Sequence, residues 1–530
     1  MGHRSRAPWY GLGVVAVLVV AVIVAGALVF SSSHASLSAD SSALAKVGLP
    51  SGGGRITSVT VVSGPHSQRI PVELRGQRIW PSATVGVHEL VSIQVVVKRP
   101  GWISWLAGSS DRVRLTLTTP SASLSEHYLT LAPGAPLRLR FKSPVKAISY
   151  GPPGHLERHV LATPQSQVAL QRASDAGSIA VAAVPRTWES SKPALVSWFP
   201  AGQATSVIAS PAPGSSILPH TPILLTFSKP VDQALGSSTP PVSPAGSGSW
   251  RTVNSHAILF EPAGAGYGLG TTVRVPLPRD VGLVGDPKTG SSGGGSWKVP
   301  AGTTLRLQQL LAGLGYLPLR VDYAGPRPAL TADAQETAAI HPPAGSFTWR
   351  YANTPAALRG MWQPGSAGVL TRGAVMAFEN DHGITADGLA GATVWRALIA
   401  AALAGHGSTS GYSFVSVNVG SQSLSLWHSG HTVVTTPVNT GVAAAPTATG
   451  TYPVYEHIAS GTMSGTNVDG SHYNDPGIQF ISYFNGGDAL HAFTRAQYGS
   501  PQSLGCVEMA TGPAGQVFPY TPIGTLVNVG

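Results

Sequence analysis

Cys506 is the only cysteine among 530 residues, so no internal disulfide can hold any part of this chain together. The folded state must therefore rest on hydrophobic cores, and a hydrophobic content of 43% is enough to build them. The 63 glycines and 44 prolines favour short strands and turns over long helices. At this length we expect about three to five domains, most of them β-rich.

The N-terminus carries an apolar run over residues 11–30, twenty positions long, preceded by His3, Arg4 and Arg6. A helix of that length crosses about 30 Å of hydrocarbon. Basic residues on the short side stay in the cytoplasm. We therefore predict a cytoplasmic tip and a transmembrane helix over residues 1–30, with a single pass through the cell membrane and the later domains outside. A cleaved signal peptide is the alternative, although its apolar core usually spans only about 7–15 residues.

Composition and strand patterns divide the segment that follows. Residues 31–53 are rich in Ser, Ala and Gly and predict a flexible linker. Residues 54–190 and 196–284 show apolar residues at every second position, as in Val91, Ile93, Val95 and Val97, which predicts two β-sandwich domains. The second contains Thr226-Phe227-Ser228 and Trp250 and resembles bacterial Ig-like domains. Residues 285–302 are rich in Gly and Ser and predict another linker.

Residues 303–404 have a helical pattern instead. Leu307, Leu310, Leu311 and Leu314 follow the spacing of one helix face. Residues 371–380 predict a second helix, and a third extends from Thr393, after an Asp-Gly turn. This order resembles the three-helix peptidoglycan-binding module, with an insertion at 321–361. A helical bundle that serves only as a spacer is the alternative.

The residues around the cysteine suggest nucleophilic chemistry. Cys506 lies in Ser503-Leu504-Gly505-Cys506-Val507-Glu508-Met509, fifteen positions after His491. A free thiol has a pKa of about 8.5, and a neighbouring imidazole can remove its proton and leave a nucleophile. The backbone N–H groups of Gly505 and Cys506 are candidates for an oxyanion hole. A buried, inert cysteine is the alternative.

The segment 412–530 resembles the L,D-transpeptidase (YkuD-type) catalytic domain, whose signature is a histidine followed by Ser-x-Gly-Cys and alternating apolar residues. Loop residues Asn439-Thr440-Gly441 and Gly450-Thr451-Tyr452 are similar as well. The fold class we expect is thus multidomain and mostly β, with a transmembrane helix, two Ig-like sandwiches, a three-helix bundle and a β-rich catalytic domain.

Two positions depart from the family pattern. Leu504 stands where many relatives have histidine or lysine, and Glu508 stands where many have arginine or asparagine, which bears on substrate contacts. Ala492 follows the histidine and cannot orient the imidazole with a side chain. A backbone carbonyl must therefore hold the second ring nitrogen, and we assign no third catalytic side chain.

We expect no cofactor and no metal. His472, Asp475 and His491 contain the ligand types of a zinc peptidase, but no spaced motif such as HExxH supports that function. We instead place Tyr473, on a loop with His472, near a substrate cleft that also includes Ser503 and Leu504.

Charge is unevenly distributed along the chain. The formal net charge is +10, yet residues 411–530 hold one basic residue, Arg495, and five acidic ones. A basic stem outside the membrane suits lipid headgroups or an anionic wall. Nucleic acid is not an expected partner, since no basic-aromatic motif is present.

The resemblance implies an extracytoplasmic transferase that joins peptidoglycan stem peptides, donor and acceptor, through 3→3 cross-links, with carbapenems acylating Cys506. Cell-wall organisation and cell shape would be its processes. Water in place of the acceptor would make it an L,D-carboxypeptidase. A non-catalytic wall-binding spacer remains a third possibility.

Overall fold

The computed structural model describes residues 34–50, 53–102, 104, 108–202, 204–244, 248–284 and 293–530. These residues form two compact units, which divide between Ser206 and Val207. The predicted transmembrane helix at 11–30 lies outside the described residues. Within the part of the chain that the structure describes, no helix is long and apolar enough to cross a membrane.

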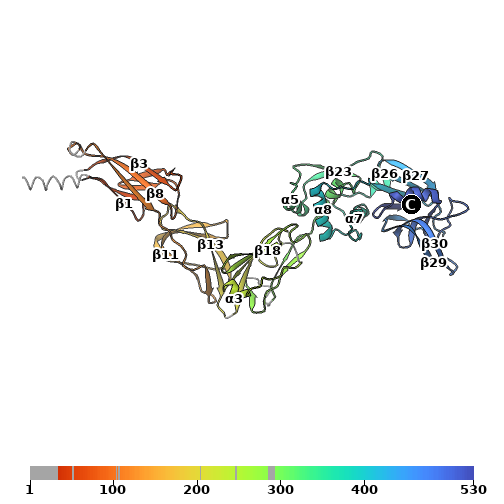
Figure 1. Cartoon of the computed structure of the whole chain (residues 1–530), viewed down its shortest axis with the longest axis horizontal. Helices are drawn as coiled ribbons and strands as arrows, with labels where there is room; N and C mark the ends of the chain where they lie inside the picture. Colours follow the sequence, from red (N-terminus) through yellow and green to blue (C-terminus); the bar gives the residue numbers. More distant parts are fainter. Residues whose placement is uncertain are drawn as a thin grey trace, which may run out of the picture. The chain divides into compact units, whose positions relative to one another are not determined.

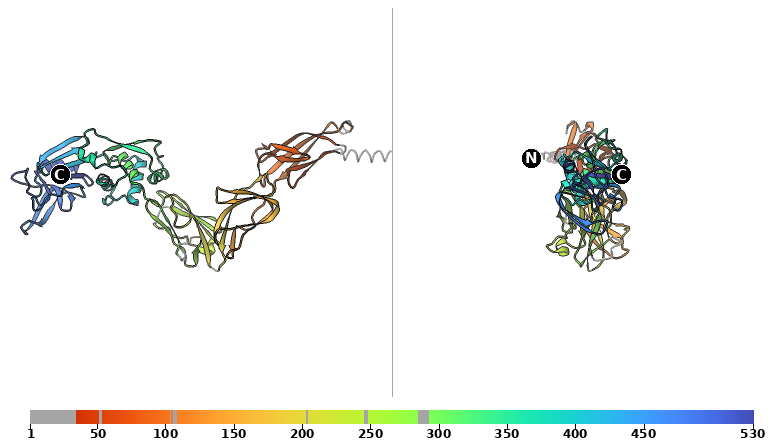
Figure 2. Two further views of the ribbon diagram at one scale, coloured as in Figure 1. Left: turned by 180° about the vertical axis from the view of Figure 1, so that it is seen from behind. Right: turned by 90° about the vertical axis from the view of Figure 1, so that its right-hand side faces the viewer.

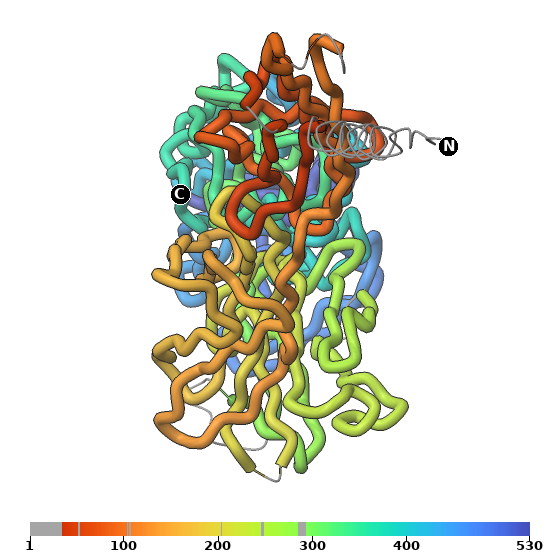
Figure 3. Tube along the Cα trace, turned by 90° about the vertical axis from the view of Figure 1, so that its left-hand side faces the viewer, coloured from red at the N-terminus to blue at the C-terminus, as the bar shows by residue number. Residues whose placement is uncertain are grey.

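The first unit begins with two four-stranded sheets around one core, traced in red and orange in Figure 3. Val91, Ile93, Val95 and Val97 face that core, as their alternation predicts. One sheet has the order β1 (Ser36–Ala39), β2 (Ala45–Gly48), β6 (Arg78–Pro81), β5 (Val72–Arg75). The other has the order β4 (Gln68–Arg69), β3 (Arg55–Ser63), β8 (Leu90–Lys98), β9 (Ser110–Thr118).

The predicted linker at 31–53 is corrected by these strands. β1 and β2 pair with each other, and β2 also pairs with β6. Leu44, Ala45 and Val47 are fully buried. The Ser/Ala-rich composition of the whole stretch did not indicate the short apolar strand β2. Burial of its apolar side chains offsets the conformational entropy that is lost when the chain becomes ordered.

A five-stranded sheet of the first unit has its own core around Leu137, Phe141 and Trp198. We expected a single sandwich over residues 54–190, but this stretch contributes to two separate hydrophobic cores. The sheet around the second core includes β15 (Ala194–Pro200), which passes the expected boundary at position 196. A short bridge between β7 (Val85–Gly86) and β14 (Glu189–Ser190) connects the early and late parts of the unit. The sheet order is β10 (Tyr128–Leu131), β15 (Ala194–Pro200), β13 (Gly177–Val184), β11 (Leu137–Gly151), β12 (Glu157–Leu170).

The second unit begins with a five-stranded sheet and a two-stranded one. The first has the order β18 (Gly248–Asn254), β19 (Ala257–Pro262), β17 (Ile223–Phe227), β16 (Thr205–Ser210), β21 (Val281–Leu283), with helix α3 (Val231–Leu235) after β17. The second pairs β20 (Thr272–Val275) with β22 (Gly295–Lys298).

Strand β22 lies inside the linker predicted at 285–302. Trp297 and Val299 are buried while Ser296 and Lys298 are exposed, which is the alternation of a half-buried strand. The prediction is wrong for this stretch, and positions 285–292 lie outside the described residues.

The helical module, residues 303–404, contains the three predicted helices, α4 (Thr304–Gly313), α7 (Val369–Asp381) and α8 (Ala392–Ala404) (Figure 1). Helix α8 begins after Gly391, so Thr393 lies inside it rather than capping it. The insertion forms a hairpin and two short helices, namely β23 (Leu319–Tyr323), α5 (Ala332–Ile340), β24 (Gly345–Trp349) and α6 (Ala356–Gly360).

The last part of the chain, blue in Figure 1 and seen from behind in Figure 2, holds two more sheets. The first opens with the hairpin of β25 and β26 and has the order β27 (His431–Pro437), β26 (Ser423–His428), β25 (Ser413–Asn418), β33 (Leu526–Val529), β28 (Gly450–Pro453). The second has the order β29 (Glu456–Thr466), β30 (His472–Asn485), β31 (Asp488–Ala492), β32 (Val507–Met509). Helix α9 (Thr511–Val517) and the 3-10 turn η1 (Phe518–Tyr520) follow β32.

The helical module packs directly on this last part. Phe414 and Leu526 belong to the same core cluster as Leu370 of α7. Gly373 and Gly524 meet backbone to backbone, so that a Cβ on Gly373 would lie 2.7 Å from the Gly524 carbonyl oxygen. Only glycine permits so close an approach.

Candidate active site

Two adjacent parallel strands bring Cys506 and His491 together. In the register of β31 and β32, His491 pairs with Glu508. Cys506 precedes Glu508 by two positions, and side chains two apart in a strand point to the same face. The thiol therefore lies on the face of the sheet that carries the imidazole, at the start of β32.

A backbone carbonyl orients the imidazole of His491, as expected because the next residue, Ala492, has no polar side chain. Nδ1 lies 3.0 Å from the carbonyl oxygen of Ala492, and because a carbonyl only accepts, Nδ1 carries the proton. Nε2 then presents its lone pair. It is buried and has no hydrogen-bond partner among the described residues.

Burial also fixes the charge of this ring. His491 is 2% exposed, and desolvation lowers its pKa below the ordinary value of 6.5, against a smaller opposing effect of the Ala492 hydrogen bond. The ring is neutral at neutral pH, which is the state a general base needs.

The thiol of Cys506 is protonated at rest. Desolvation raises its pKa to about 12, and the carboxylates of Asp488 and Glu508 add to the rise. Its Sγ lies 3.6 Å from the carbonyl oxygen of Gly487, to which it donates. The resting site thus holds a neutral thiol and a neutral imidazole on one sheet face with no hydrogen bond between them, and proton transfer must accompany binding of a substrate.

Ser503 shapes the loop that presents the thiol. Its hydroxyl donates to the Cys506 carbonyl at 2.5 Å and accepts the Gly505 N–H at 3.3 Å. The Gly505 N–H that we expected in the oxyanion hole therefore has a long hydrogen bond inside the loop. Ser503 is buried, whereas Leu504 is half-buried.

Gly505 occupies a position that a side chain cannot. Its φ is +120°, and a Cβ there would lie 2.3 Å from Oδ1 of Asp488. Asp488 is itself held by the Ala448 N–H at 3.2 Å. The carboxylate thus lies against the loop just before the cysteine, a proximity that sequence motifs did not indicate.

We expect Gly505→Ala to slow acylation of Cys506 by about a hundredfold, because both the backbone strain and the clash with Asp488 displace the thiol. The rate of carbapenem adduct formation, followed by intact-protein mass spectrometry, measures this. Gly512→Ala is the matched control, since Gly512 has no atom within 4 Å of a built Cβ. Equal rates for both variants would contradict the assigned role of Gly505.

Glu508 proves to be an ion-pair partner. Arg495 donates Nε and Nη2 to its two carboxylate oxygens at 2.8 and 2.7 Å. Buried Asn439 bridges to Glu508 through the backbone and accepts the Gly499 N–H at 3.0 Å. A signal was present in the sequence, because Arg495 is the one basic residue after position 410.

Three tyrosines lie near enough to the thiol to respond to its charge. Burial raises the pKa of Tyr455, Tyr473 and Tyr483, and the charge of a Cys506 thiolate would raise each further. This brings the predicted Tyr473 to the site and adds two tyrosines that the sequence did not suggest. Tyr473 and His472 belong to strand β30, however, and not to a loop as expected.

No metal site accompanies these residues. Throughout the described segments, no group of three or more His, Cys, Asp and Glu side chains is placed to hold a metal ion. A cavity of about 330 Å³ borders the end of β31, lined by Ala492 and Phe493 on one side and by Asp475–Gln479 on the other.

A partly exposed thiol beside a buried neutral imidazole defines the class of cysteine–histidine nucleophilic sites. Residues 413–529 match the YkuD family, described as the L,D-transpeptidase catalytic domain. This part of the chain is therefore an L,D-transpeptidase catalytic domain. No curated protein matches the chain.

Several solved structures are similar. A catalytic domain of an E. faecium L,D-transpeptidase acylated by ertapenem is 23% identical, covering 23% of this chain and 98% of its own, with a TM-score of 0.21. An L,D-transpeptidase from Mycobacterium smegmatis is 10% identical, covering 62% and 100%, with a TM-score of 0.21. L,D-transpeptidase 3 from Mycobacterium tuberculosis is 12% identical, covering 61% and 97%, also with a TM-score of 0.21.

Proposed function

We propose that this protein is a peptidoglycan L,D-transpeptidase that forms 3→3 cross-links through an acyl-thioester on Cys506. The observation that carries the proposal is the unpartnered Nε2 lone pair of His491, buried on the same sheet face as the thiol. A buried acceptor without a donor is unfavourable unless a reaction uses it.

The steps follow from these positions. His491 Nε2 takes the thiol proton as Sγ attacks the carbonyl of the L-to-D peptide bond in a donor stem. The tetrahedral intermediate collapses, the C–N bond breaks, and the imidazolium returns the proton to the departing D-alanine amine. The side-chain amine of an acceptor stem then attacks the thioester, forming the new amide and restoring the thiol.

The negative oxygen of the tetrahedral intermediate needs hydrogen-bond donors. We assign this role to the backbone N–H groups of Gly505 and Cys506. The bond from Gly505 to Ser503 is 3.3 Å long, near the limit of a hydrogen bond, so this N–H can turn to a stronger anionic acceptor.

Hydrolysis of the same thioester is the second candidate, because Cys506 is partly exposed and water can reach it. Incubating the protein with a disaccharide tetrapeptide distinguishes the two. A tetrapeptide–tripeptide dimer with release of one D-alanine identifies the transpeptidase, whereas tripeptide alone identifies the carboxypeptidase. Neither product would favour the non-catalytic wall-binding spacer.

Placement in the cell follows as part of the proposal. The N-terminal apolar run would anchor the chain in the membrane with its domains outside. The helical module would contact the wall. Fractionation of cells and protease protection of the C-terminal domain test this arrangement.

The lowered pKa of His491 sets the pH dependence of acylation. Since the ring stays neutral below its ordinary value of 6.5, we expect the rate of carbapenem adduct formation to hold constant from pH 8 down to 6.5 and to fall only at lower pH. Iodoacetamide should react slowly with the same thiol, whose pKa is raised to about 12. An acid limb centred above pH 6.5 would contradict the assigned neutral state of the ring.

A further inference from the structure

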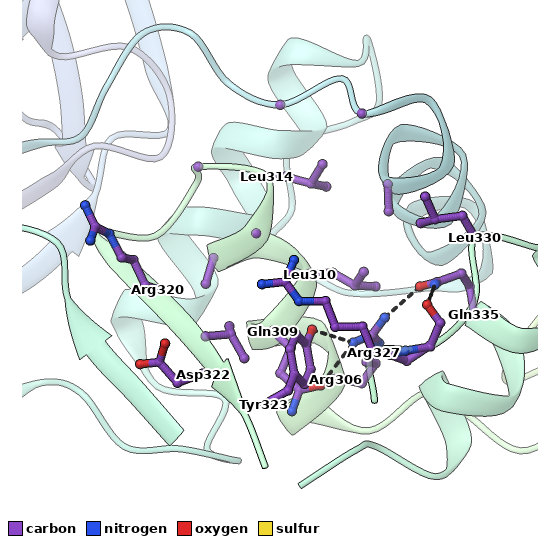
Figure 4. Close-up of a pocket in the computed structure, with 18 of the residues that line it drawn as sticks. Arg306, Gln309, Leu310, Leu314, Arg320, Asp322, Tyr323, Arg327, Leu330 and Gln335 are labelled. Atoms are coloured by element: carbon purple, nitrogen blue, oxygen red, sulfur yellow. Dashed lines mark hydrogen bonds between the residues drawn. The ribbon is translucent and has the colours of Figure 1, made fainter. Parts of the chain in front are cut away.

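The helical module contains the cavity shown in Figure 4, which has a volume of about 930 Å³. It is larger than the cavity of about 330 Å³ next to β31. Its walls come from α4, from strand β23, from the chain that leads to α5, from Arg350 and from Ala402, Gly405, Gly407 and Ser408 at and after the end of α8. Strand β23, the chain before α5 and Arg350 belong largely to the insertion at 321–361, which the three-helix module it resembles does not have. The cavity is therefore a feature of this chain, and its size suits several linked residues of a ligand.

The lining of this cavity is cationic. Arg306, Arg320, Arg327 and Arg350 contribute to it, and Asp322 is the one acidic residue. Asp322 accepts from Thr348 at 3.1 Å. Among the described residues, none of the four arginines forms an ion pair with a carboxylate.

Arg306 is the most unusual of the four, because it is charged, 2% exposed and surrounded by neutral groups. Its guanidinium donates to Gln309 Oε1 at 3.1 Å, to the Tyr323 hydroxyl at 2.9 Å and to Gln335 Oε1 at 2.6 Å. Its Nε has no partner within the described chain. A buried cation without a counter-charge is unfavourable, and an anion in the cavity would compensate it.

A second arginine is placed to meet the same anion. The guanidinium of Arg327 lies 5.7 Å from the ring centre of Tyr323, whose hydroxyl binds Arg306. Tyr323 thus links the two cations (Figure 4). Arg350 is less available, since it donates to the carbonyls of Leu319 at 2.8 Å and Ala312 at 2.6 Å. Guanidinium groups pair with carboxylates through two parallel hydrogen bonds.

The rest of the wall mixes aliphatic side chains with polar ones, Gln309, Gln335 and Ser408. Leu310, Leu314 and Val321 line the cavity, and Leu330 stands 72% exposed among the lining residues. An exposed leucine beside a cationic site favours a ligand that has alkyl groups close to its negative charge.

We infer that this cavity binds the terminal carboxylate of a short peptide with small alkyl side chains, held by Arg306 and Arg327. The anionic character follows from the arginines alone, whereas the choice of a peptide rests on the proposed function, whose substrates are stem peptides ending in such carboxylates. The site would hold a stem peptide apart from the one that acylates Cys506.

Calorimetric titration of the full-length Cys506→Ala protein tests this, with acetyl-alanyl-alanine as the probe. We expect binding that weakens at least about tenfold when the probe is the C-terminal amide, because a charge-assisted pair is lost. Arg327→Gln should weaken binding of the carboxylate probe by a similar factor. Arg327 is exposed, so this variant should fold, and its melting temperature checks that.

Arg372→Gln removes the same charge from α7 outside the cavity and should bind the probe as the parent does. Equal binding of the amide, equal weakening by Arg372→Gln, or tighter binding of inorganic phosphate than of the peptide would each overturn the inference. The Arg327→Gln protein with Cys506 intact is also assayed for cross-linking of stem peptides. This assay tests the proposed function by itself, so a failed binding experiment is not mistaken for a failure of that function.

Discussion

Replacing Cys506 by alanine should abolish the carbapenem adduct and the cross-linked product, and serine in its place should lower both rates at least about a thousandfold. The reason is chemical, because serine has the right shape but a far less acidic and less nucleophilic side-chain group. Intact-protein mass spectrometry after carbapenem treatment measures the first rate, and muropeptide analysis measures the second.

Cys506 is the only thiol in the chain, so an adduct on any other residue could not be a thioester. A drug-sized mass increase that persists in Cys506→Ala would therefore refute the assigned nucleophile. Preserved melting temperature in the variant shows that the loss is chemical. The thiol is one partly exposed group on a loop held by Ser503, so we expect little effect of serine on stability.

His491→Gln should slow acylation by about 10²–10⁴-fold, the usual contribution of a general base. Glutamine has no basic nitrogen at neutral pH and cannot take the thiol proton. We expect the loss of rate to lie at the high end of this range. Because the pKa of Cys506 is raised, almost no thiolate forms unless His491 removes the proton.

His431→Gln is the matched control, since it makes the same exchange at an exposed position of the catalytic domain. It should acylate as the parent does. If His491→Gln kept the parent rate, or if raising the pH to 9 restored it fully, the thiol would ionise without His491 and the assignment would fail.

The proposed catalytic pair could be assigned from sequence because Cys506 lies in a short, specific motif that follows a histidine. The neighbouring residues Ser503 and Gly505 were enough to indicate Cys506 as the nucleophile. Because Ala492 follows His491 and has no polar side chain, the sequence also indicated that no side chain at that position orients the imidazole. The structure confirms the backbone carbonyl that this required. Local rules of chemistry suffice when the interacting atoms are close in sequence.

The surroundings of that pair could not be predicted, since they depend on contacts between distant segments. Asp488 meets Gly505 only because β31 and β32 are neighbours in the sheet. The ion pair of Glu508 with Arg495 left only an indirect signal, since Arg495 is the one basic residue after position 410.

The two linker predictions fell short for a related reason. Composition averages over a window, so residues 36–48 looked flexible although Leu44 and Val47 are fully buried. Likewise one tryptophan, Trp297, makes a strand out of a glycine-rich stretch. A few buried side chains decide the structure where the average does not.

The contact between Gly373 and Gly524 packs helix α7 directly against the catalytic sheet. A side chain at either position would meet the carbonyl oxygen of the other and push the two backbones apart. The joint between the helical module and the catalytic domain therefore depends on two residues that have no side chain and take no part in the chemistry.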